Sequence, residues 1–193
     1  MPKEPQLEFG PDKRVAAVRK PEHLPAALGV DWPVVFLLIG DLFTAEDYVA
    51  RAKSAGKKVF LHVDFIAGLG GDPVAMKFVA ERIKPDGIIS TKSHFVKNAK
   101  KYGMLAIQRL FIIDTSALEQ GIHNIRQSEP DAVEIMPGLI PRVISELRAA
   151  VSVPIIVGGL IREQSEIETA LRAGASAVSM GSRQLWVQGV RAL

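Results

Sequence analysis

Eight short apolar segments recur along this chain at an average interval of about 23 residues. Each is rich in β-branched residues and too short for a buried helix, which is typical of strands that are buried on both faces of a parallel sheet. Amphipathic stretches with helical spacing separate them. Eight strand-then-helix units at this interval predict an α/β fold, a compact (β/α)8 TIM-like barrel in a single domain. The segments are centred near residues 16, 36, 61, 89, 107, 134, 156 and 179.

The boundaries of these segments follow from glycines, prolines and helix-capping residues. We expect residues 1–10 to form a flexible N-terminal arm and residues 11–193 to form the barrel domain. A flavodoxin-like open sheet would use about five units and leave about 70 residues unplaced, which favours the barrel. The predicted strands span residues 14–18, 34–38, 58–64, 87–90, 105–111, 132–135, 154–157 and 177–180, and the last helix spans 182–190.

Composition limits the classes of protein to which the chain can belong. Its 193 residues are 48% hydrophobic, enough for one well-packed domain, and no apolar run reaches the roughly 18 residues of a spanning helix. The absence of cysteine excludes disulfides, thiolate catalysis and Cys-ligated metals, and the four isolated histidines predict no metal site. We expect a cytoplasmic protein. The net charge of +3 is compatible with a phosphorylated ligand or with nucleic acid.

Glycines follow the last two predicted strands. Gly158-Gly159 comes after the seventh and Gly181-Ser182 after the eighth. A glycine lets a phosphate oxygen approach the backbone N–H, and the loops after strands seven and eight of such barrels often hold phosphate. Either loop alone would be explained by a tight turn. Together they predict a phosphate-binding site at the backbone of Gly158, Gly159, Gly181 and Ser182.

Charged residues occur at the carboxyl ends of several predicted strands, where the mouth of a barrel lies. A charge inside an apolar strand is costly unless it is paired, so these residues either pair with one another and brace the barrel or contact a ligand. They are Asp64, Lys92, Arg109 and Glu134. His62 shares a strand face with Asp64, and a satisfied core histidine explains it better than a functional one.

A basic face is predicted on the fourth helix. Lys97, Lys100 and Lys101 fall at helical spacing and could follow an RNA backbone. On the residues alone, an ordinary solvated helix face explains them better, because no known RNA-binding signature accompanies them.

An ordered set of motifs resembles one known family. The motifs are HVD at 62–64, GIISTKS at 87–93, AIQR at 106–109, DTSA at 114–117, EIMPG at 134–138, GGLIR at 158–162, AGA at 173–175 and the closing LW at 185–186. Together they are similar to the glycerol uptake operon antiterminators, also called glycerol-3-phosphate responsive antiterminators. The resemblance covers residues 14–187. The sequence departs from the family pattern at Phe65 and at Gly181.

The resemblance implies a TIM-barrel regulator that senses glycerol 3-phosphate, binds the mRNA leader of glycerol-uptake genes and acts in transcription antitermination. It implies no catalytic residues and no cofactor. The partners would be glycerol 3-phosphate and the mRNA leader, with no membrane, and a homo-oligomer is left open. Asp64, Lys92, Arg109 and Glu134 would surround the glycerol hydroxyls or brace each other, with Arg162 near the phosphate. The alternative is a small TIM-barrel enzyme acting on a phosphorylated polyol or sugar.

Overall fold

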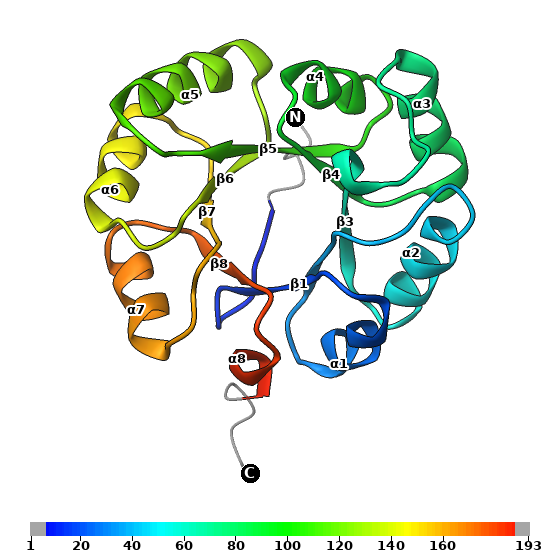
Figure 1. The fold of residues 1–193 in the computed structure, drawn as a ribbon, viewed down its shortest axis with the longest axis horizontal. Coiled ribbons are helices and arrows are strands. Elements are labelled where there is room, and N and C mark those ends of the chain that lie inside the picture. Colours follow the sequence, from blue (N-terminus) through cyan, green and yellow to red (C-terminus); the bar gives the residue numbers. More distant parts are fainter. Residues whose placement is uncertain (1–6, 188–193) are drawn as a thin grey trace, which may run out of the picture.

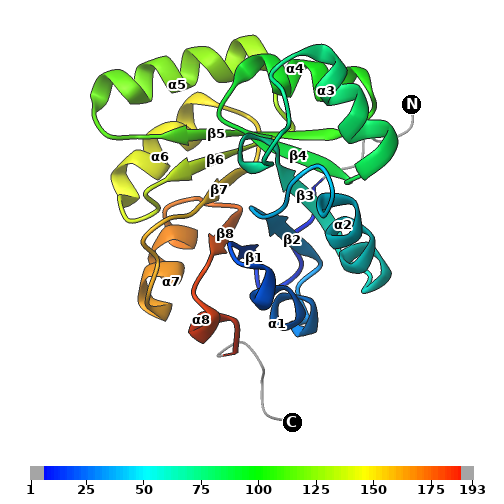
Figure 2. The same cartoon turned by 45° about the vertical axis from the view of Figure 1, so that its right-hand side comes forward.

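The computed structural model describes residues 7–187, and it is a closed barrel of eight parallel strands in sequence order. β1 pairs with both β2 and β8, which closes the ring, and helices cover its outside (Figures 1 and 2). The predicted (β/α)8 architecture is therefore confirmed. The strands are β1 Arg14–Val18, β2 Val34–Leu37, β3 Lys58–His62, β4 Gly87–Ser90, β5 Leu105–Phe111, β6 Ala132–Met136, β7 Ile155–Val157 and β8 Ala177–Met180.

A helix follows each strand and returns the chain to the other end of the barrel, as right-handed crossovers require. The α-helices are α1 Leu24–Gly29, α2 Ala45–Ser54, α3 Pro73–Phe78, α4 Ser93–Lys101, α5 Thr115–Ser128, α6 Pro141–Ala150, α7 Gln164–Arg172 and α8 Arg183–Val187. The 3-10 turn η1 Pro21–His23 leads into α1, and the π-helical turn η3 Val79–Ile83 ends the α3 segment. The last three residues of the predicted final helix, 188–190, lie outside the described residues.

β3 is shorter than the sequence predicts. It ends at His62, and Val63–Phe65 form the 3-10 turn η2 instead of continuing the strand. The physical reason is a hydrogen-bond network: the Asp64 carboxylate accepts from the backbone N–H of Thr91 at 2.7 Å and from the Ser90 hydroxyl at 2.8 Å. Asp64 is thereby held against the end of β4 rather than on the face it would have as a strand residue.

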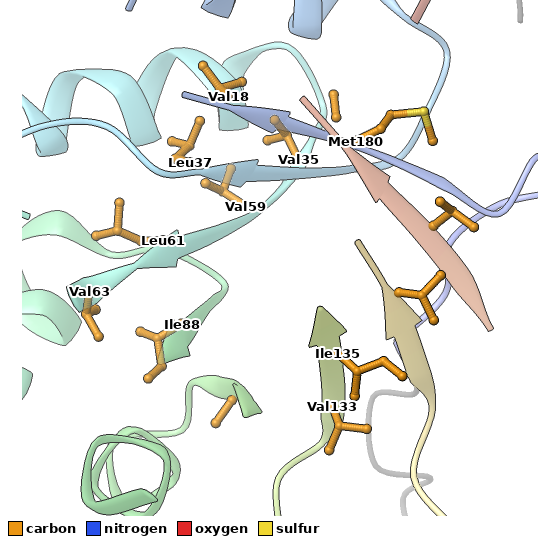
Figure 3. Close-up of a cluster of buried hydrophobic side chains, with 14 of the residues drawn as sticks. Val18, Val35, Leu37, Val59, Leu61, Val63, Ile88, Val133, Ile135 and Met180 are labelled. Atoms are coloured by element: carbon orange, nitrogen blue, oxygen red, sulfur yellow. The ribbon is translucent and has the colours of Figure 1, made fainter. Parts of the chain in front are cut away.

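Strand residues alternate between two apolar layers. One set faces the helices and makes the larger core, part of which is drawn in Figure 3 with Val35, Leu61 and Ile135. The other set fills the barrel interior and includes Phe36 and Phe60. Because both faces of each strand are buried, the strands appear in the sequence as continuous apolar runs rather than as alternating apolar and polar residues.

The interior core extends below the strands. Leu7 and Phe9 are buried against the inward-facing side chains, and the stretch before β1 crosses the opening of the ring in Figure 1. The predicted flexible arm, residues 1–10, lies partly outside the described residues. Its described part packs as a plug at the amino-terminal end of the barrel, because two apolar side chains there would otherwise face water.

Removing the plug should destabilise the whole barrel. Phe9→Ala should lower the free energy of unfolding by about 3 kcal/mol, because it leaves a cavity where a phenyl ring was buried. Phe43→Ala is the matched control: Phe43 is 93% exposed, and its loss should change stability by about 0.5 kcal/mol or less. Urea denaturation of both variants measures the difference, and equal stabilities would show that Phe9 contributes nothing to the core.

Candidate anion-binding site

A cavity of about 710 Å³ opens at the carboxyl ends of the strands. This is the end of a (β/α)8 barrel at which ligands bind. Its lining comes from the ends of β1, β5, β6, β7 and β8 and from the turn after β3. The lining residues include Arg19, Phe65, Arg109, Phe111, Met136, Gly159, Leu160, Arg162, Ser179, Gly181 and Ser182.

The loops after β7 and β8 line this cavity with Gly159, Gly181 and Ser182. Gly159 has a φ of +76°, a conformation that side-chain-bearing residues rarely adopt. Among the described residues, no acceptor is hydrogen-bonded to the backbone N–H groups of Gly159, Gly181 and Ser182. Since β7 and β8 are neighbours in the barrel, both loops offer donors at the same side of the mouth.

Gly158 has a different role from the one predicted for it. Its N–H donates to the carbonyl of Ile135 at 3.0 Å and therefore belongs to the sheet. A Cβ at this position would collide with the Ser179 hydroxyl and would lie 3.1 Å from Glu134 Oε1. Gly158 thus leaves room for polar side chains inside the barrel.

Three arginines border the cavity. Arg19 and Arg162 are exposed at its edge, and Arg109 enters from β5 and is only 3% exposed. Guanidinium groups beside unpaired amides attract oxyanions and hold them by charge-assisted hydrogen bonds. The side of the mouth near β7, β8 and β1 is therefore suited to an anion.

A buried ion pair lies at the base of the mouth. Arg109 Nε donates to Glu134 Oε2 at 2.8 Å, and the Ser179 hydroxyl donates to Glu134 Oε1 at 2.5 Å. Glu134 is completely buried. Arg109 Nη2 also lies 2.8 Å from Oε2, but its N–H bonds are not directed at that oxygen and have no acceptor among the described residues. The pair brings together two of the predicted polar residues.

The other two predicted polar residues, Asp64 and Lys92, are not among the residues that line the cavity. Burial opposes the ionised form of Asp64, yet the hydrogen bonds from Thr91 and Ser90 outweigh it and hold the pKa of the carboxyl below its usual range. Lys92 is exposed at the start of α4, with Nζ 5.5 Å from the centre of the Phe95 ring. Asp64 thus braces the ends of β3 and β4, and Lys92 covers an aromatic side chain.

His62 is buried at the end of β3, and its side chain is 1% exposed. Burial lowers the pKa of the imidazole to about 3, and the nearby Arg109 charge adds to this effect while Asp64 opposes it. The ring is therefore neutral at physiological pH. Neither ring nitrogen has a hydrogen-bond partner among the described residues, and the Phe65 ring packs against it at 4.5 Å between centroids.

The predicted basic face lies away from the mouth lining. Lys97, Lys100 and Lys101 are exposed on α4. The Lys100 ammonium donates to the carbonyl of Glu129 at 2.6 Å, and that of Lys101 donates to Asn98 at 3.2 Å.

Ser179 was missed by sequence reasoning as part of the site, and Arg19, a polar residue at the end of the first predicted strand, was not assigned to it. Arg19 follows the inward-facing Ala17 by two positions, and Ser179 lies between the inward-facing Ala177 and Gly181. The period-2 alternation of strands could have placed both on the inner face. In the part of the chain that the structure describes, no group of three His, Cys, Asp or Glu side chains could hold a metal, and no helix is long and apolar enough to cross a membrane.

The fold and the cavity define a small (β/α)8 barrel with a cavity at its mouth that backbone glycines and arginines line. The sequence profile of the glycerol-3-phosphate responsive antiterminators matches residues 14–186, so the chain belongs to that family, which is regulatory.

Solved structures and a curated relative agree with this assignment. The glycerol uptake operon antiterminator regulatory protein of Listeria monocytogenes is 35% identical, with a TM-score of 0.91 over 95% of this chain and 99% of the other. An antiterminator-related protein of Thermotoga maritima is 33% identical, with a TM-score of 0.81 over 93% and 99%. The uncharacterized protein YgcP of Escherichia coli is 33% identical over 89% of this chain and 90% of its own.

The pH dependence of stability should report the neutral state of His62. Because its folded pKa lies below its unfolded value of about 6.5, the unfolded chain binds the extra proton first as pH falls. Stability should be fully present above about pH 6.5 and should fall towards pH 4 by on the order of 1 kcal/mol per pH unit. Denaturation at pH 4.5–7 measures the slope. His62→Gln, which does not titrate, should show a shallower slope, and identical slopes would contradict the assignment.

Proposed function

We propose that this protein binds glycerol 3-phosphate at the barrel mouth and, in that state, binds the mRNA leader of glycerol-uptake genes in the cytoplasm. The observation that carries the ligand proposal is the set of unpaired N–H groups at Gly159, Gly181 and Ser182 beside Arg19 and Arg162. They would hold the phosphate. Arg109 would face the glycerol end, Gly158 would provide room, and Glu134 would hold Arg109 in place. Asp64 and Lys92 would support the rim.

Binding without turnover is the role that fits the polar groups best. Both carboxylate oxygens of Glu134 are occupied by Arg109 and Ser179, so it is poorly placed to act as a general base. The alternative, an enzyme acting on a phosphorylated polyol or sugar, gains only a shared fold from barrel aldolases that are below 20% identical. Proton NMR of glycerol 3-phosphate incubated with the protein separates the two, because only an enzyme would yield product resonances.

RNA binding would use the basic face on α4, formed by Lys97, Lys100 and Lys101. The three lysine side chains are exposed, as contacts to a phosphate backbone require, and the hydrogen bonds of Lys100 to Glu129 and of Lys101 to Asn98 would give way to such contacts. The coupling between the sites would be reciprocal: if the ligand tightens RNA binding, RNA must tighten ligand binding by the same factor. A homo-oligomer would be compatible with this arrangement.

Blocking one amide loop should weaken ligand binding. A Cβ at Gly181 would lie 3.3 Å from the flexible Arg19 side chain and 3.6 Å, an ordinary contact distance, from the Ala17 carbonyl oxygen, so Gly181→Val should fold while filling the approach to the backbone N–H. We expect affinity for glycerol 3-phosphate to fall at least about tenfold, the loss of one charge-assisted hydrogen bond. Gly29→Val is the control, because Gly29 lies in open space at the end of α1. Calorimetric titration compares them, and unchanged affinity in Gly181→Val would place the anion elsewhere.

The RNA proposal is tested by a gel shift on the leader upstream of the glycerol genes, with and without glycerol 3-phosphate. Replacing Lys97, Lys100 and Lys101 with Gln should weaken binding and reduce the slope of log affinity against log salt by about 2, because about 0.7 counterions are released per single-strand phosphate contact.

The matched control replaces Arg51, Lys77 and Arg172 with Gln. These substitutions remove three exposed charges that form i,i+4 ion pairs on other helices. Equal effects of the two triple variants would show that net charge, rather than the α4 face, drives binding. No shift with the unaltered protein, with or without ligand, would remove the regulator proposal.

A further inference from the structure

Two buried side chains at the base of the mouth carry nitrogen atoms that have no hydrogen-bond partner among the described residues. They are both ring nitrogens of His62 and Arg109 Nη2, which lies 2.8 Å from Glu134 Oε2 without an aligned hydrogen bond to it. A buried donor or acceptor left unpaired costs about 1–3 kcal/mol, so folded proteins keep few of them without a ligand or water to fill the role. Their occurrence in the same part of the barrel points to a second polar subsite.

The subsite lies across the mouth from the amide loops. β3, which ends at His62, is four strands from β7 in the closed ring of eight, and β5 carries Arg109 between them. Figure 1 shows β3 and β7 on opposite sides of the ring. A ligand whose phosphate rests on Gly159 and Gly181 would therefore extend its other end towards Arg109 and His62.

The chemistry of the two groups selects what they can bind. A neutral imidazole has one donor and one acceptor, whereas the remaining N–H groups of a guanidinium only donate. The positive charge of Arg109 is already balanced by Glu134 at 2.8 Å, which disfavours a second anion there. A hydroxyl group donates and accepts, so it satisfies both side chains, whereas a carbonyl oxygen can only accept.

We propose that His62 is a specificity-determining residue, which together with Arg109 binds the hydroxyl groups of a polyol phosphate and discriminates against ketone and deoxy analogues. The proposal rests on the proposed function, because it assumes a phosphate ester at the amide loops. Phe65 covers the imidazole and lines the cavity. His62 itself does not line the cavity, so the proposal requires the Phe65 ring, which is 55% exposed on a short 3-10 turn, to rotate away from the imidazole when the ligand binds.

The test compares three phosphate esters by calorimetry: glycerol 3-phosphate, dihydroxyacetone phosphate and n-propyl phosphate. The unaltered protein should prefer glycerol 3-phosphate over both by at least about tenfold, because the analogues leave buried polar groups unpaired. His62→Phe keeps an aromatic ring beside Phe65 but removes both nitrogens. It should lose about tenfold or more in affinity for glycerol 3-phosphate and should keep its affinity for n-propyl phosphate within about twofold.

His62→Gln should restore part of the preference, since its amide also donates and accepts. It also keeps the experiment informative if the phenylalanine variant does not fold. An equal loss of affinity for all three esters in either variant would show a packing role and overturn the proposal. Unchanged selectivity in both would mean that the imidazole binds buried water, which also overturns it.

The failure of this proposal and that of the proposed function are distinguishable. If the unaltered protein binds none of the three esters, the anion site itself is wrong, and the specificity proposal falls with it. If it binds n-propyl phosphate as well as glycerol 3-phosphate, the anion site stands and only the role of His62 is overturned.

Discussion

The ion pair between Arg109 and Glu134 determines what the mouth of this barrel can do. Both groups are almost completely buried, where a lone charge would be prohibitively costly, so each requires the other. The Ser179 hydroxyl donates to the other carboxylate oxygen of Glu134. Because Gly158 has no side chain, there is space for this hydroxyl. The result is a guanidinium that is fixed in position beside the cavity, with its charge balanced by Glu134.

This division of charge separates the mouth into two zones. The amides after β7 and β8, which have no acceptor among the described residues, form with Arg19 and Arg162 the zone in which we propose that an anion binds. The deeper zone, with its neutral imidazole, favours groups that both donate and accept hydrogen bonds. A small molecule with a phosphate at one end and hydroxyls at the other would match both zones at once, which agrees with the family to which the chain belongs.

The sequence was sufficient to predict the architecture because the strand-then-helix pattern is repeated eight times. The number and order of the strands, the glycine loops and the charged strand ends followed from local patterns. Long-range contacts determined the features that local patterns did not predict. Asp64 bonds to residues of β4 and ends β3 early, the Gly158 N–H is taken by β6, and Lys92 turns to Phe95. Nothing in the spacing of Leu7 and Phe9 indicates burial, since two apolar residues before a strand have no periodicity to interpret.

A barrel has two openings, and here the segment before β1 closes the one opposite the cavity. Were Leu7 and Phe9 absent, water could enter the interior from that side and approach the charged groups above. A wetter interior would raise the local dielectric and weaken the attraction that holds Arg109 to Glu134. Leu7 and Phe9 thus insulate the recognition chemistry from the far end of the molecule, although neither of them lines the cavity.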